Sequence, residues 1–181
     1  MSHEKAVEKI AVTREKRLPY VDLRGLELEE IPKELLNVPW ISSLALSQNA
    51  LQDLSLLREF KHLKKLALSH NKIYDISALE GFDNLKYLFL RYNEISDLTP
   101  LRGLKKLKKL VLNDNRIEDI SPLASIPSLV FLDLSRNSVN TCTSLAGLPE
   151  LRWLSLEENP VDPAACQALR ESLGSLYVFK Y

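Results

Sequence analysis

Histidines, cysteines and a regular series of aspartates are the side chains in this sequence that could carry catalytic or metal chemistry. The histidines, His3, His62 and His70, have no second ligand or base at a recognisable spacing. No zinc-protease, thiol-redox, serine-hydrolase or phosphate-loop motif occurs, and five glycines leave little material for phosphate-binding loops. The sequence therefore predicts no enzyme, no metal site, no cofactor and no small-molecule substrate.

The aspartates recur at a constant interval, at Asp53, Asp75, Asp97 and Asp119. A ladder of carboxylates could bind cations, but one carboxylate per repeat offers no clustered set of ligands. Each aspartate stands two residues before a serine or threonine, which we interpret as the N-cap of a short helical turn. The carboxylates would then accept N–H groups at the start of that turn. The hydroxyl column consists of Ser55, Ser77, Thr99, Ser121 and Thr143.

The two cysteines are expected to be unpaired. Cys142 occupies the position that Ile76 and Ile120 hold in earlier repeats, which predicts a core residue that behaves as a small hydrophobe. Cys166 follows in the last segment, and a redox pair between the two cysteines is not expected. Two cysteines form no disulfide framework, and the charged N-terminus has no apolar signal segment. These features predict a reducing, cytoplasmic location.

One repeating frame organises these positions along most of the chain. The segment 107–123, LKKLVLNDNRIEDISPL, places aliphatic residues at a fixed spacing around Asn115. Self-similarity of this kind is typical of a leucine-rich repeat solenoid. The frame places asparagine at Asn49, Asn71, Asn93, Asn115, Asn137 and Asn159, and leucine at Leu63, Leu85, Leu107, Leu129, Leu151 and Leu173.

Each repeat is expected to contain a short strand and, on the return, a single helical turn. The asparagine follows the strand, where its amide can bond to backbone groups that would otherwise be buried without a partner. Residues 18–40 form a degenerate first repeat with Leu26 in place of the asparagine. Five regular units follow from residue 41 to residue 150.

The N-terminal segment differs from the repeats. Residues 2–16 predict a helix whose narrow apolar stripe comprises Val7, Ile10, Ala11 and Arg14. Because a solenoid has an open hydrophobic end, we interpret this helix as a cap. The alternative is an amphipathic helix that binds a partner.

The C-terminal segment is expected to close the other end of the stack. Asp162 predicts the N-cap of a helix. Leu173, Leu176 and Val178 then return to the leucine frame and predict a last strand in the same register.

These elements predict an α/β solenoid: a curved leucine-rich repeat with a parallel concave β-sheet and short helical turns on the convex side. The pattern L-x-x-L-x-x-L-x-L-x-x-N-x-I-x-D-I-S-x-L resembles the repeats of the nuclear regulatory subunit of protein phosphatase 1 and of bacterial internalins. The resemblance implies a concave sheet that grips a protein. The predicted units are an N-terminal capping helix at residues 1–17, repeats at 18–162 and a C-terminal helix–strand cap at 163–181.

The outward positions of the strands are where a function should be sought, because the fold alone does not set one. Aromatic residues occupy these positions on neighbouring strands, about 4.8 Å apart, and contiguous exposed aromatics are typical of interaction sites. Alternatively, loops or long neighbouring side chains cover part of the row. The predicted partner-binding residues are Tyr87, Phe89, Arg91, Tyr92, Val111, Phe131, Arg136, Trp153 and Tyr177.

Lysines recur where the strands begin and predict a basic edge. Solvated loop charges are the simpler interpretation, and an acidic peptide or protein partner is the alternative. Equal numbers of basic and acidic residues, 24 of each, and the lack of an RNA-binding aromatic motif disfavour nucleic acid. No run approaches the ~18 apolar residues of a membrane helix, so no membrane partner is predicted. The basic edge consists of Lys64, Lys65, Lys86, Lys108 and Lys109.

The sequence thus predicts a non-catalytic protein–protein interaction scaffold that binds a protein, of unspecified identity, on its concave face. One alternative is a structural or regulatory segment of a larger multidomain protein. The other is a binder of an anionic partner through the lysine edge, whose affinity would fall steeply with salt.

Overall fold

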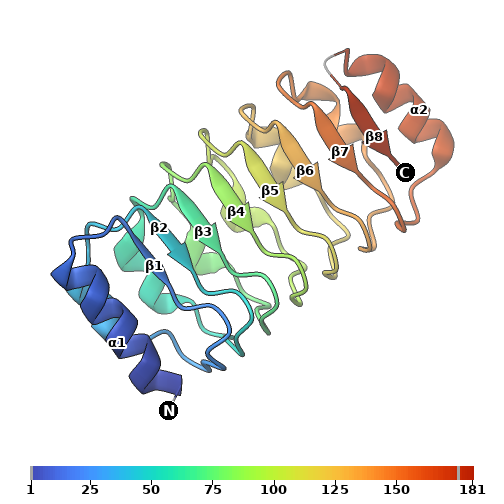
Figure 1. Cartoon of the computed structure of the whole chain (residues 1–181). Coiled ribbons are helices and arrows are strands. Elements are labelled where there is room, and N and C mark those ends of the chain that lie inside the picture. Colours follow the sequence, from blue (N-terminus) through green and yellow to red (C-terminus); the bar gives the residue numbers. More distant parts are fainter. Residues whose placement is uncertain (1, 175) are drawn as a thin grey trace.

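Each repeat contributes one strand, and the strands lie parallel in a single curved sheet. The computed structural model describes residues 2–174 and 176–181. Among these residues, eight strands pair in chain order, so each strand bonds only to its neighbours in the sequence (Figure 1). The strands are Tyr20–Asp22 (β1), Ser43–Ala45 (β2), Lys65–Ala67 (β3), Tyr87–Phe89 (β4), Lys109–Val111 (β5), Phe131–Asp133 (β6), Trp153–Ser155 (β7) and Val178–Lys180 (β8).

Short 3₁₀ turns form the return path behind the sheet, as the sequence predicted for a single helical turn (Figure 1). The 3₁₀ geometry suits them because it rises about 2.0 Å per residue and is favourable only in short pieces. The turns are Lys33–Asn37 (η1), Ser55–Phe60 (η2), Ser77–Leu79 (η3), Thr99–Leu101 (η4), Ser121–Ser125 (η5) and Thr143–Gly147 (η6).

The leucine frame forms the core between the sheet and the turns. In the central repeat, Leu110 from the strand, Leu112 directly after it, and Ile117 and Leu123 from the return path are completely buried. Each such side chain contributes about 1.5–3 kcal/mol when removed from water. Because every repeat supplies the same set, the core continues along the solenoid from one end to the other.

The asparagine column links each repeat to the preceding one, as predicted. The Asn115 amide nitrogen donates to the carbonyls of Leu90 at 3.0 Å and Leu112 at 2.9 Å. Its amide oxygen accepts the Ile95 N–H at 3.0 Å. One side chain therefore satisfies backbone groups from two successive repeats.

The aspartate column caps the 3₁₀ turns, and the hydroxyl column does not. Asp53 Oδ1 accepts the N–H of Ser55 at 2.8 Å, and Asp53 Oδ2 accepts the Ser55 hydroxyl at 2.8 Å. The residue at the N-cap position is Leu54, and Ser55 is the first residue of the turn. The predicted N-cap role of the serines and threonines is wrong, because each of them is the first residue of its turn, and the Ser55 hydroxyl donates to Asp53 rather than accepting an N–H of the turn.

Because of these hydrogen bonds, the contribution of the aspartates to the stability of the fold depends on pH. The N–H and hydroxyl groups two residues later lower the pKa of Asp53 and Asp119, and the hydroxyl and N–H of Thr99 lower the pKa of Asp97. A carboxyl group whose pKa is lower in the folded chain stabilises the fold above its unfolded pKa, about 3.9. That contribution is lost as the pH falls through the folded pKa.

We therefore expect the free energy of unfolding to fall as the pH drops below about 4, through the lowered pKa values. Replacing Asp53, Asp97 and Asp119 together by asparagine should flatten this fall, because asparagine still accepts hydrogen bonds but does not titrate. Urea midpoints measured across that pH range test the expectation, with the exposed Asp83→Asn as control. A triple variant that loses stability with acid as steeply as the wild type would contradict it.

The N-terminal helix α1 (Ser2–Glu15) lies at the β1 end of the solenoid and packs against β1 and η1 (Figure 1). Its buried face consists of Ala6, Ile10 and Thr13, and the Thr13 hydroxyl donates to the Tyr20 carbonyl at 3.1 Å. That bond lets a polar residue enter the interface, so the predicted apolar stripe is wrong. Of that stripe only Ile10 is buried, whereas Val7 is half-buried and Ala11 and Arg14 are exposed. Across the described residues, no helix is long and apolar enough to cross a membrane.

The C-terminal end contains helix α2 (Pro163–Ser172) followed by β8. Asp162 caps α2 by accepting the Ala164 N–H at 3.0 Å, as predicted. The predicted register of β8 is wrong: the leucine frame aligns Leu176 with Leu154, whereas in the sheet Phe179 pairs with Leu154. The reason is that an α-helix rises only about 1.5 Å per residue, so the return path uses more residues than a 3₁₀ turn does.

Both cysteines are buried, which confirms the predicted core position of Cys142. Their side chains lie close to each other because α2 packs against η6, a proximity that their separation in the sequence did not indicate. Burial raises the pKa of Cys142, and it raises the pKa of Cys166 to about 11.

We expect both thiols to react slowly with a thiol-specific reagent in native buffer. Loss of thiolate alone should slow Cys166 by about a hundredfold relative to an exposed thiol, since the thiolate is the nucleophile. Thiol titration with and without denaturant measures the difference. Rapid labelling of Cys142 in the folded protein would place it at the surface and contradict its core position.

Candidate partner-binding surface

The first and last residues of each strand face outwards and form the concave surface of the sheet. In β4, Leu88 is completely buried, whereas Tyr87 is exposed and Phe89 is half-buried. This alternation follows from the pleat of a strand, which points successive side chains to opposite faces. Because the strands pair in register, outward side chains of equivalent positions stand side by side on neighbouring strands.

A row of alternating cations and aromatic rings crosses the middle of this surface. Phe131 and Trp153 stack with their ring centroids 4.0 Å apart and 5° between the ring planes. Lys109 Nζ lies 4.1 Å from the centroid of Phe131 and 5.8 Å from that of Phe89. Lys65 Nζ lies 5.9 Å from the same Phe89 ring. We call these five residues the central row; each is exposed or half-buried.

A second group of side chains lies beside the central row. Tyr87 and Tyr92 keep 41% and 40% of their surface exposed. The Tyr92 ring stacks on His70 with the centroids 4.5 Å apart, and the Arg91 guanidinium lies 4.9 Å from the Tyr92 centroid. The predicted residues Tyr87, Phe89, Arg91 and Tyr92 are therefore brought together around β4.

One outward position of the repeat has a left-handed backbone conformation, which sets the direction of its side chain. Tyr92 has φ 52° and Arg136 has φ 53°, a conformation that costs a residue with a side chain about 1 kcal/mol or more. The N–H of Tyr92 donates to the Asn113 carbonyl of the next repeat at 3.0 Å, which helps to hold it there. The repeat frame places this column at an outward position, but its left-handed conformation is not evident from the sequence, because its residues share no chemical type. It consists of Gln48, His70, Tyr92, Asp114, Arg136 and Glu158.

Arg136 is already engaged within the protein. Its Nη2 donates to Asp114 Oδ2 at 2.8 Å, and its Nη1 lies 3.6 Å from Glu158 Oε1. The hydrogen bond from Arg136 lowers the pKa of Asp114. A partner's carboxylate would have to compete with this pair for Arg136.

Two of the predicted partner-binding residues are not available on the concave face. Val111 is in an outward position but is buried, with 9% of its surface exposed, because its short side chain lies between Phe89 and Asp133 in the sheet. Tyr177 is 83% exposed but precedes β8, and its N–H bonds to the Arg152 carbonyl where the strands begin. Its predicted place on the concave face is wrong because of the shifted β8 register.

The predicted basic edge divides into two sets. Lys64, Lys86 and Lys108 follow one another where the strands begin, with the Lys86 N–H bonded to the Lys64 carbonyl and the Lys108 N–H to that of Lys86. Lys65 and Lys109 belong to the strands and contact the rings of the central row. A binding role for the edge set stays a prediction.

The sheet also carries a hollow of about 550 Å³ over β1 to β4 that sequence analysis did not identify. The small outward residues Ser43, Ala45 and Ala67 form its floor, and Tyr20 and Phe89 stand on either side. The available clue was this run of small residues at outward positions of β2 and β3. The hollow offers a bulky side chain of a partner direct access to the sheet.

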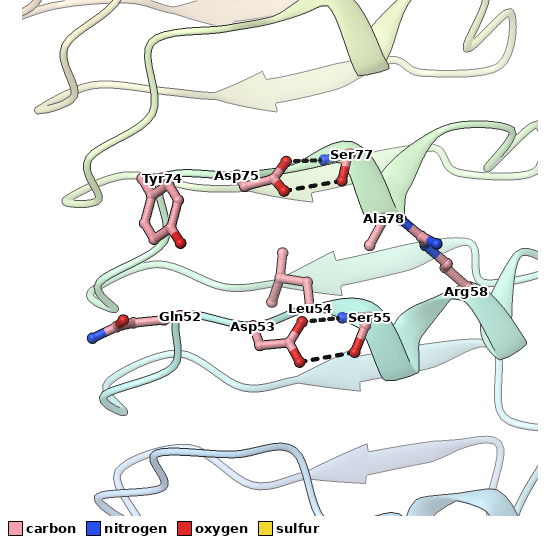
Figure 2. A pocket seen from close by; sticks show the side chains of 9 residues that line it. All are labelled: Gln52, Asp53, Leu54, Ser55, Arg58, Tyr74, Asp75, Ser77 and Ala78. Carbon is pink, nitrogen blue, oxygen red and sulfur yellow. Dashed lines mark hydrogen bonds between the residues drawn. The ribbon is translucent and has the colours of Figure 1, made fainter.

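A smaller hollow of about 270 Å³ lies beside η2 and η3, away from the sheet (Figure 2). Asp53 and Asp75 line it, but their carboxylates bond to Ser55 and Ser77 of their own turns, as the dashed lines in Figure 2 show. Within the part of the chain that the structure describes, no three His, Cys, Asp or Glu side chains are grouped to hold a metal ion.

The solenoid and its asparagine ladder define a class of protein that comparison with known families also finds. The family described as Leucine Rich repeats (2 copies) matches residues 61–103 and 83–125, and Leucine rich repeat matches residues 105–161. Together these matches cover more than half of the chain. The chain belongs to the leucine-rich repeat family, whose members generally mediate protein–protein interactions.

Several solved structures are similar to this chain. An internalin (inlF) of Listeria monocytogenes shows 29% identity and a TM-score of 0.87 over 96% of this chain and 54% of its own. An internalin C2 (inlC2) of the same organism shows 21% identity and a TM-score of 0.78 over 97% of this chain and 91% of its own. A leucine-rich repeat protein of Leptospira interrogans shows 23% identity and a TM-score of 0.68 over 88% and 54%. The present chain thus spans about half of the first internalin, and no curated protein matches it.

Proposed function

We propose that this chain is a non-catalytic scaffold that binds a protein partner on the concave face of its sheet. The main observation in its support is the stacked pair of Phe131 and Trp153, which stays partly exposed on β6 and β7 as part of the central row. Large aromatic side chains in such a position bury much area with few rotamers to freeze, and tryptophan and tyrosine are enriched among the residues that dominate binding energy.

The geometry of the row also favours binding through a low entropic cost. The Phe131 ring contacts Trp153 on one side and the Lys109 ammonium on the other, so its position is largely set before a partner arrives. Ordering a long side chain at an interface typically costs about 0.5–1.5 kcal/mol, and a pre-ordered row avoids part of that cost. A cytoplasmic location for this activity stays a prediction.

Capture from a lysate of the native host tests the proposed function. The baits are the wild type, Trp153→Ala on the concave face and the exposed Glu80→Ala beside η3. We expect a protein that the wild type and Glu80→Ala retain and that Trp153→Ala loses. Equal capture by the wild type and a fully folded Trp153→Ala, or loss only with Glu80→Ala, would argue against a concave binding face.

A further inference from the structure

We infer that the protein partner presents an acidic segment to the middle of the concave face, where it contacts Lys65, Arg91 and Lys109. The inference rests on the proposed function, because it assigns the chemistry of the partner at that same surface. Three observations support it: the cations that lack acidic neighbours, the apolar surroundings of these cations, and the hollow beside them.

Lys65, Arg91 and Lys109 share a lack of acidic partners. Throughout residues 2–174 and 176–181, no carboxylate stands at salt-bridge distance from any of the three. They belong to neighbouring repeats, since Lys65 is in β3, Arg91 follows β4 and Lys109 is in β5. The middle of the sheet therefore carries positive charge that the protein itself does not neutralise.

The other outward arginines are neutralised locally. Arg24 Nη2 lies 2.6 Å from Asp22 Oδ2, and Arg136 holds both oxygens of Asp114. The charge of Arg91 also lowers the pKa of Asp114, but that carboxylate is already occupied by Arg136. Although the whole chain has 24 basic and 24 acidic residues, the outward cations that lack a carboxylate at salt-bridge distance are thus concentrated over β3 to β5.

The surroundings of the cations strengthen their attraction for an acidic side chain. Lys65 Nζ and Lys109 Nζ lie 5.9 and 5.8 Å from the centroid of the same Phe89 ring. Acidic side chains that reach these two ammonium groups would pair with them beside an apolar ring, where charge pairing is stronger than in open water. The Arg91 guanidinium offers paired donors, a geometry that suits a carboxylate.

The hollow beside the cations offers a second contact, for a bulky side chain of the partner. Phe89 is also its wall, and Lys65 and Arg91 line it, so a bulky side chain in the hollow would be adjacent to a carboxylate at the cations. A protein segment can offer both groups within a few residues. The acidic side chains Asp133 and Glu157 lie outward beyond this region, on β6 and after β7, and would repel a continuous chain of phosphates. These features favour a protein over a nucleic acid.

A selection from a random-peptide display library on the wild-type protein tests the inference. Peptides that it enriches are then titrated against Lys65→Met and Lys109→Met, which keep the length of the side chain and remove its charge. The adjacent edge residues provide matched controls as Lys64→Met and Lys108→Met. We expect enriched peptides with net negative charge, about tenfold weaker binding to each concave variant, and little change with the edge variants.

Several outcomes would overturn the inference. Enriched peptides without an acidic excess whose binding still needs Trp153 would refute it and leave the proposed function standing. Tighter binding of a single-stranded DNA oligonucleotide, with the same dependence on Lys65 and Lys109, would assign the site to nucleic acid. A selection that enriches no peptide above the bait-free control would also count against it. Failure of the proposed function itself would instead appear in the lysate capture, as retention that does not depend on the concave face.

Discussion

Asn115→Ala is expected to lower the free energy of unfolding by about 2 kcal/mol, within the range for an orphaned buried group, without changing the concave face. The side chain is the acceptor for the Ile95 N–H at 3.0 Å, and no other acceptor for that group is present among the described residues. A buried N–H left without a partner costs about 1–3 kcal/mol.

In this variant the carbonyl groups that bond to Asn115 each lose one of two hydrogen bonds, whereas the Ile95 N–H loses its acceptor. Leu90 accepts from both Asn93 and Asn115, and Leu112 accepts from both Asn115 and Asn137. Each carbonyl therefore keeps one of its two bonds in the variant. The loss acts on the contact between successive repeats, and stability in a solenoid is largely a sum of such contacts.

Urea unfolding midpoints measure this effect. Asn84→Ala is a matched control, because Asn84 is exposed and its side-chain oxygen accepts a hydrogen bond from the Lys106 ammonium at 2.8 Å rather than from a buried backbone group. Asn115→Asp is a second variant, which removes the two donors and brings a negative charge towards carbonyl oxygens, so it should be at least as destabilising as alanine. A midpoint of Asn115→Ala that matches the wild type would show that the amide does not hold the backbone as described.

The regular part of this fold is predictable from the sequence because equivalent residues of every repeat pack in the same core positions. The Asn115 position predicts its own ladder bonds, since a polar residue in a fixed place among leucines must satisfy buried backbone groups. Likewise the position of Asp53 predicts an acceptor at the start of a turn. Positions that recur in the sequence with the repeat period therefore make equivalent hydrogen bonds in successive repeats of the structure.

The sequence-based predictions fail where one element departs from the repeat period, or where contacts with a neighbouring residue determine whether a side chain is buried. The α2 helix shifts β8, so Tyr177 leaves the sheet face although the leucine frame assigns it an outward position. Val111 is covered by the residues beside it, which the alternation within its own strand does not reveal. Thr13 is buried because of a single hydrogen bond to a distant carbonyl. Such effects depend on tertiary contacts rather than on periodicity.

Part of the candidate site is predictable because the outward strand positions also recur with the repeat period. The sequence places Phe89, Phe131 and Trp153 outward on their strands, and the structure brings them into one row with Lys65 and Lys109. The hollow over β2 and β3 needs the sheet as well as the sequence, because it arises from small residues on two strands between larger ones.

Phe131→Ala is expected to weaken binding of the partner by about 2 kcal/mol or more, which is a factor of about thirty in affinity. The ring contacts two other members of the central row, with the Trp153 ring stacked at 4.0 Å and the Lys109 ammonium at 4.1 Å from its centroid. Its removal takes away one anchor and releases both neighbours to alternative rotamers. The side chain is half-buried on the outer face of β6, so the core beneath it should remain intact.

Calorimetric titration of the captured partner into wild type, Phe131→Ala and the convex-side Glu80→Ala tests whether the partner binds on the concave face. Thermal melts first establish that all three proteins are folded. We expect Phe131→Ala to lose about thirtyfold in affinity and Glu80→Ala to bind like the wild type. Unchanged affinity in Phe131→Ala together with weakened binding in Glu80→Ala would contradict this expectation.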